Sequence, residues 1–197
     1  MVGSRMSGAA RAARLVADVL RGATLLSALA TVVFFGGHGV VIFVVLFAVL
    51  LLPRFLEVAA PFDAAFCATM LVAAWAEQQN WYVTVSWVDE VVHSVTPGAA
   101  AVATYLMLAR LDVMPDVREH MGSTRRFSLV VLVVFVGLGL ATLWEFYEWV
   151  AEQLAPQATQ VGYDDTISDL ALGGAGSLVA GVLLVTWFRL RHEDRHA

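Results

Sequence analysis

The sequence predicts an all-α, polytopic membrane protein with six transmembrane helices and both termini in the cytoplasm. Hydrophobic residues make up 59% of the 197-residue chain, and the mean hydropathy is +0.74, far above that of a soluble globular domain. Several apolar runs approach the roughly 20 residues that a helix needs to cross a bilayer. We therefore expect residues 1–197 to form a single multi-pass transmembrane domain, with the lipid bilayer as its main partner.

Apolar runs and glycine or proline breaks set the expected helices at about 12–36, 38–52, 62–78, 87–109, 127–151 and 165–188. The first apolar block, 22–52, is too long for one helix, and the run GGHG at 36–39 divides it because glycine permits a tight turn. Pro53 is expected to end the second helix, since proline disrupts helical hydrogen bonding. Pro97 is expected to kink the fourth.

The distribution of charge supports this topology. With six helices, all twelve arginines lie on one side of the membrane or at its boundary, whereas nine acidic residues lie on the other. Cytoplasmic loops carry an excess of basic residues, so the arginine side is predicted to be the cytoplasm. A single helix over 22–52 would place four arginines outside, which favours two helices there.

Acidic residues and one histidine gather near the outer ends of the last three predicted helices. The candidate ligands are Asp89, His93, Glu145, Glu148, Asp165 and Asp169. Each helix contributes a pair spaced three or four residues apart, which places the pair on one helix face. Carboxylate oxygens with an imidazole suit a divalent cation such as Zn, Mn, Fe, Mg or Ca. Without a cation these carboxylates would repel one another, so the sequence favours a metal site of unknown identity.

Structural roles are open beside this interpretation. Asp165 and Asp89 fit the first turn of a helix, where the helix dipole favours acids. That role does not explain Asp169 or His93, which sit one turn deeper. Glu145 and Glu148 lie near a helix C-terminus, where the dipole disfavours acids.

Three functions follow from these roles. The first is a metal-binding protein, which could also hydrolyse a lipid-linked or envelope substrate. The second is a non-catalytic envelope factor in which the acid cluster is structural. An ion-coupled transporter is the third and least favoured, because the inner halves of the helices are nearly all apolar. Whether the protein is an enzyme stays open. The sequence contains no basic groove with interleaved aromatic residues, so no nucleic-acid partner is expected.

Three motifs occur in order on consecutive predicted helices: WVDEVVH, WEFYEW and GYDDTISDLALGGAG. This pattern resembles the uncharacterised bacterial YjdF-like inner-membrane family, in which D-x-x-x-H, W-E-x-x-E and D-T-x-x-D-L recur in this order. It is more distantly similar to VanZ-like proteins, which often carry an amide where Glu148 and Asp169 stand. The resemblance covers about Pro53 to Gly181. It implies the fold, a location in the bacterial inner (plasma) membrane and the same six candidate ligands, and it implies little about activity.

Overall fold

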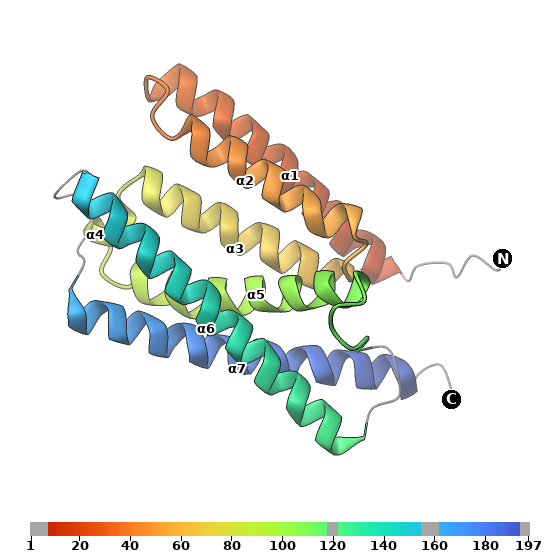
Figure 1. Ribbon diagram of the computed structural model, residues 1–197. Helices are drawn as coiled ribbons and strands as arrows, with labels where there is room; N and C mark the ends of the chain where they lie inside the picture. The colour runs from red at the N-terminus through yellow and green to blue at the C-terminus, as the bar shows by residue number, and fades with distance from the viewer. Residues whose placement is uncertain (1–7, 118–121, 155–161, 194–197) are drawn as a thin grey trace. The chain divides into compact units, whose positions relative to one another are not determined.

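The computed structural model describes residues 8–117, 122–154 and 162–193, which form seven helices and no strand (Figure 1). The all-α prediction is therefore confirmed over these residues. The chain divides into two compact units, Met1–Gln79 and Asn80–Ala197, called unit 1 and unit 2 below. The prediction of a single transmembrane domain stays a prediction.

Unit 1 consists of α1 (Gly8–Phe34), α2 (Val40–Phe55) and α3 (Ala60–Gln78). The predicted glycine turn joins α1 to α2, which lie side by side in Figure 1. Gly36, Gly37 and Gly39 have φ angles of 61°, 85° and 83°, a left-handed conformation that glycine adopts because it has no Cβ. His38 lies exposed in this turn.

The prediction that Pro53 ends the second helix is wrong, because α2 continues through Pro53 to Phe55. Proline removes only its own amide donor, and the next residues keep the helical pattern: the Leu56 amide donates to the Leu52 carbonyl at 3.0 Å. The helix ends one turn later, where Glu57 adopts a φ of 51°. An isolated missing donor near a helix terminus is thus tolerated, and the change in backbone conformation terminates the helix.

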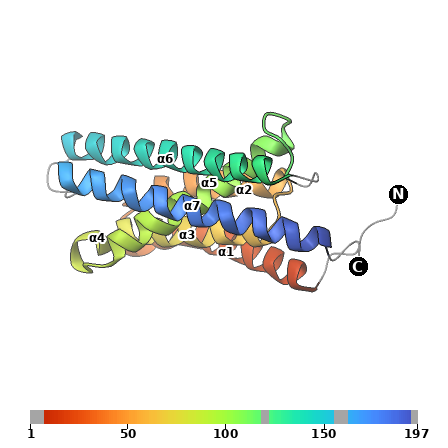
Figure 2. The ribbon, with the colours of Figure 1, turned by 90° about the horizontal axis from the view of Figure 1, so that it is seen from below.

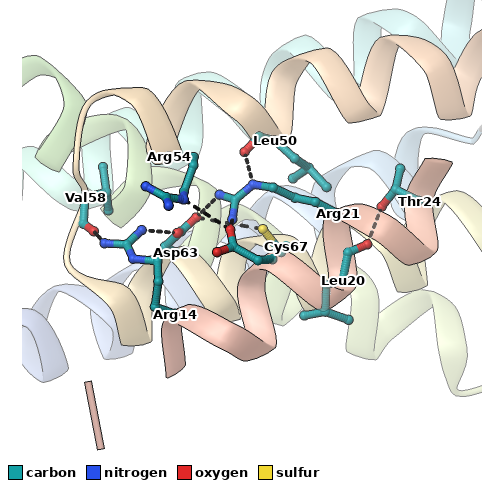
Figure 3. Close-up of polar contacts among 10 residues, drawn as sticks. Arg14, Leu20, Arg21, Thr24, Leu50, Arg54, Val58, Asp63 and Cys67 are labelled. Carbon is teal, nitrogen blue, oxygen red and sulfur yellow. Dashed lines mark hydrogen bonds and ion pairs between the residues drawn. The ribbon is translucent and has the colours of Figure 1, made fainter. Parts of the chain in front are cut away.

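A buried carboxylate joins the helices of unit 1 (Figure 3). The Asp63 side chain at the start of α3 is fully buried. It accepts hydrogen bonds from Arg14, at 2.5 Å, and from Arg21, both on α1. The two guanidinium groups also donate to the backbone carbonyls of Val58 and Leu50, each at 2.7 Å.

Two further charged residues complete this group. Asp18 accepts hydrogen bonds from Arg21 at 3.0 Å and from Arg54 on α2 at 3.2 Å. We call the five charged residues the Asp63 cluster: Arg14, Asp18, Arg21, Arg54 and Asp63. Buried charges are tolerated where they are paired and hydrogen-bonded, and this cluster ties together the start of α1, the end of α2 and the start of α3.

Unit 2 consists of α4 (Trp81–Thr84), α5 (Val88–Arg110), α6 (Ser123–Leu154) and α7 (Tyr163–Glu193). The last three match the helices predicted at 87–109, 127–151 and 165–188, although α6 and α7 extend further at both ends. The four-residue α4 was not predicted, because so short a segment carries no helical periodicity. Pro97 lies inside α5, which is one continuous element.

Small residues allow α5 and α7 to pack backbone against backbone. A Cβ placed on Gly176 would lie 1.6 Å from the carbonyl oxygen of Ser94, and one on Gly98 would lie 2.6 Å from the carbonyl oxygen of Gly176. Neither position tolerates a side chain without movement of the backbone. Close approach through glycine is a common way for membrane helices to associate, and here it fixes how α7 is rotated against α5.

Among the residues that the structure describes, four helices are long and apolar enough to cross a membrane: α1, α5, α6 and α7. Helix α2 is apolar but has only 16 residues. The chain therefore has the helices of a multi-pass membrane protein. The two further crossings, by α2 and α3, stay a prediction.

Candidate metal centre

The candidate site lies at one end of unit 2, where α5 and α7 begin and α6 ends. Figure 2 shows α6 and α7 running side by side, and the colours show that the chain runs in opposite directions along them. The predicted ligands come from these three helix ends. The ends of these three helices meet at one end of unit 2, and this brings residues of the three predicted pairs close together.

One buried imidazole lies at the centre of the site. The His93 side chain is 5% exposed, and each ring nitrogen faces two carboxylates. His93 Nε2 lies 3.4 Å from Asp89 Oδ1 and 4.0 Å from Glu148 Oε1. His93 Nδ1 lies 3.7 Å from Asp169 Oδ1 and 3.8 Å from Glu145 Oε1. We call these five residues the His93 cluster.

Helical spacing brings the members of the cluster together. Asp89 and His93 are four residues apart on α5, and Glu145 and Glu148 are three apart on α6, so each pair shares a face. Asp169 and Glu145 are buried, with 4% and 8% of their surface exposed. Carboxylates in or beside a membrane need a partner or a cation, and His93 is their shared neighbour.

Three of the five residues meet the geometric requirement for one common ion. A ligand atom from each of Asp89, His93 and Asp169 lies within 4.8 Å of the other two. In addition, His93 Nε2 is buried and has no hydrogen-bond partner. Leaving a buried polar atom unpaired costs about 1–3 kcal/mol, so this nitrogen is poised for a ligand. These three groups offer a cation two oxygen donors and one nitrogen donor.

The structure distinguishes the remaining predicted ligands from this trio. Glu145 and Glu148 approach His93 but lie outside the group of three. Asp165 is half-buried, one turn before Asp169 on α7, and also lies outside it. Asp164 is exposed, as a first-turn acid is expected to be. The full six-residue ligand set stays a prediction.

Two aromatic residues that the sequence did not single out as site residues border the His93 cluster. The rings of Tyr82 on α4 and Trp144 on α6 each meet the His93 ring edge-on, with centroids 6.3 Å apart. Trp144 Nε1 donates a hydrogen bond to Glu148 Oε1 at 2.9 Å. The four-residue spacing of Trp144 and Glu148 signals a shared helix face, whereas nothing in the sequence connects Tyr82 to His93.

The comparisons with known proteins bear on the family alone. No curated protein and no solved structure matches the chain. A family model described as "Predicted membrane protein (DUF2238)" matches residues 12–190. This match confirms the expectation of an uncharacterised membrane family, and the YjdF-like and VanZ-like resemblances stay predictions. Because the match covers nearly the whole sequence, the chain belongs to the DUF2238 family of predicted membrane proteins.

Proposed function

We propose that this membrane protein binds a divalent cation between Asp89, His93 and Asp169. The observation that carries the proposal is the buried His93 Nε2, which has no hydrogen-bond partner although two carboxylates lie within 4.0 Å of it. A cluster that existed only to be hydrogen-bonded would pair this atom, because buried polar groups in folded proteins nearly always have a partner.

The distances within the cluster support the same proposal. An N–H···O hydrogen bond spans about 2.7–3.2 Å, and the four nitrogen–oxygen separations of 3.4–4.0 Å are longer. Two ligands that each lie about 2.1 Å from a tetrahedral zinc ion are about 3.4 Å apart. For calcium, with ligands at about 2.4 Å, the same angle gives about 3.9 Å. The 3.4 Å between His93 Nε2 and Asp89 Oδ1 is therefore compatible with two ligands of one cation.

Charge balance favours a cation as well. Four carboxylates surround one imidazole, which carries at most one positive charge against as many as four negative charges. A carboxylate oxygen of Asp89 and one of Asp169 lie within 4.8 Å of each other, and repulsion between two ionised carboxylates at that separation is strong in a partly buried environment. A divalent cation reduces this repulsion and supplies the missing partner of His93 at the same time.

We further propose six membrane crossings, with both termini in the cytoplasm of a bacterial cell and the His93 cluster at the outer face. In unit 2, Arg110, Arg125 and Arg189 lie near the helix ends opposite the cluster. In unit 1, the Asp63 cluster gathers three arginines at the end that holds the α2–α3 connection. The positive-inside rule assigns both arginine-rich ends to the cytoplasm.

Cysteine labelling tests this topology. In a Cys67→Ala background, His38→Cys and Gly162→Cys are expected to react with a membrane-impermeant maleimide on intact cells. Ala59→Cys, between α2 and α3, is expected to react only after permeabilisation. Reaction of Ala59→Cys on intact cells would instead show that α2 and α3 do not cross, leaving four crossings.

The substrate class that we propose for this site is a lipid-linked or envelope ester or phosphoester. A bound divalent cation can polarise a carbonyl or phosphoryl oxygen. Glu148 lies beside the three proposed ligands and is 14% exposed, so it is the candidate that accepts a proton from water. The alternative is a non-catalytic envelope factor in which protonated carboxylates hydrogen-bond to one another and hold the three helices together. This alternative predicts that no metal is bound.

Metal retention in matched variants tests the cation proposal. We expect detergent-purified wild-type protein to retain a divalent cation, and Asp169→Asn to lose it, because the amide removes a charged ligand from the trio. Asp164→Asn is the matched control, since Asp164 is an exposed aspartate on the same helix. Elemental analysis by mass spectrometry reads the result. Equal metal content in Asp169→Asn and Asp164→Asn would overturn the proposed ligand set.

A further inference from the structure

Trp144 contacts both the central imidazole and one of the carboxylates beside it. Its indole Nε1–H, which is a donor only, lies 2.9 Å from Glu148 Oε1. Its ring meets the His93 ring at an interplanar angle of 78°.

The hydrogen bond has a consequence for the orientation of Glu148. A glutamate side chain has several rotatable bonds, and fixing it in one conformation carries an entropic cost. The indole donor selects the conformation in which Oε1 lies 4.0 Å from His93 Nε2. An ionised carboxylate has two oxygens with about four lone-pair sites, so Glu148 can accept the indole proton and still act on a cation or on a water molecule.

We propose that Trp144 is a positioning residue, which holds Glu148 beside the cation site by donating to its Oε1. This inference rests on the proposed cation binding and adds that Glu148, whose Oε1 lies 4.0 Å from His93 Nε2, contributes to it as a carboxylate beside the trio. Trp144 acts through Glu148 rather than as a ligand. Residues that orient the groups around a metal typically change its affinity 10–100-fold when they are replaced. The Trp144 side chain has the features of an orienting residue: its rigid ring contacts His93, and its indole N–H donates to Glu148.

Replacing Trp144 by Phe tests this role, because phenylalanine keeps an aromatic ring and removes the donor. We expect Trp144→Phe to weaken Mn²⁺ binding about tenfold, measured by electron paramagnetic resonance of free Mn²⁺ with the full chain in detergent. Trp149→Phe is the matched control: it is the same substitution on the same helix, at a residue that is 54% exposed. Its dissociation constant is expected to equal that of the wild type.

A double-mutant cycle separates positioning from packing. If Trp144 acts through Glu148, Trp144→Phe has little further effect, about twofold or less, in a Glu148→Ala background. A tenfold loss in both backgrounds would show that Trp144 only packs against the site, and unchanged affinity in Trp144→Phe would show that it has no role; either overturns the inference alone. Wild-type protein that binds no Mn²⁺, Zn²⁺ or Ca²⁺ would overturn the proposed function and the positioning role together.

Discussion

Replacement of Asp63 by Asn is expected to lower the free energy of unfolding of unit 1 by about 3–5 kcal/mol, the usual effect of removing one partner from a buried ion pair. The Asp63 carboxylate is fully buried and accepts from Arg14 and Arg21. Arg21 itself is 4% exposed. The amide is neutral, so it leaves a buried guanidinium without its main countercharge.

The single cysteine of the chain offers a local measurement of this effect. Cys67 is fully buried, and its Sγ lies 3.8 Å from Asp63 Oδ1. Its rate of reaction with a thiol reagent at increasing denaturant reports the opening of unit 1. We expect the reaction to begin at clearly lower denaturant in Asp63→Asn than in the wild type.

Asp18→Asn is the matched control for this experiment. Asp18 belongs to the same cluster, but its side chain is 42% exposed, and exposed ion pairs contribute about 0–1 kcal/mol. The control is therefore expected to behave almost as the wild type. If Asp63→Asn and Asp18→Asn protect Cys67 equally well, the Asp63 cluster does not hold unit 1 together.

Divalent cation is expected to stabilise the wild-type protein and to leave His93→Ala unaffected. A ligand that binds only the folded state stabilises it by about 2.7 kcal/mol at a concentration of 100 times its Kd. Removing the imidazole removes the only nitrogen donor of the proposed trio. The measurement is thermal unfolding in detergent, with and without added Mn²⁺ or Zn²⁺, after treatment with a chelator.

His38→Ala is the matched control here, because His38 is an exposed histidine in the glycine turn of unit 1. It is expected to gain the same thermal stabilisation from cation as the wild type. Equal stabilisation of His93→Ala and His38→Ala would mean that the cation binds elsewhere. Loss of the effect in His38→Ala alone would contradict the assignment of His93 as the nitrogen ligand.

The sequence predicted the long helices well because their signals are strong and local. Long apolar runs predicted the helices of unit 2, and the GGHG run predicted the turn between α1 and α2. Two features were predicted wrongly or missed: the end of the second helix, which was assigned from a single proline, and a helix too short to show a periodic pattern. Pro53 lies inside α2 rather than after it, and α4 has only four residues.

The site was predicted in part, for a reason that follows from helix geometry. Pairs three or four residues apart share a face, so Asp89 and His93 could be assigned to one cluster. Residues four apart still differ by about 40° around the axis. Whether Asp165 or Asp169 faces His93 therefore depends on how α7 is rotated against α5, and the contact between Gly176 and Ser94 that fixes this rotation is not a sequence pattern.

The Asp63 cluster could not be predicted from the sequence, for a different reason. Its charges were placed on the predicted inner side, but nothing in the spacing of Arg14, Arg21 and Asp63 indicates that one carboxylate would be buried between two arginines. Contacts between residues 42 and 49 positions apart depend on the packing of three helices. The same holds for Tyr82, whose ring reaches His93 from a separate short helix.

The most direct test of the proposed cation site is the metal content of the wild-type protein, purified in detergent without chelator and analysed by mass spectrometry. Cation binding by Asp89, His93 and Asp169 predicts close to one equivalent of a single divalent metal per chain, retained through gel filtration. Protein that contains no metal, and still takes up none after incubation with Mn²⁺, Zn²⁺ and Ca²⁺, would contradict the proposal. The four carboxylates around His93 would then be a protonated structural cluster.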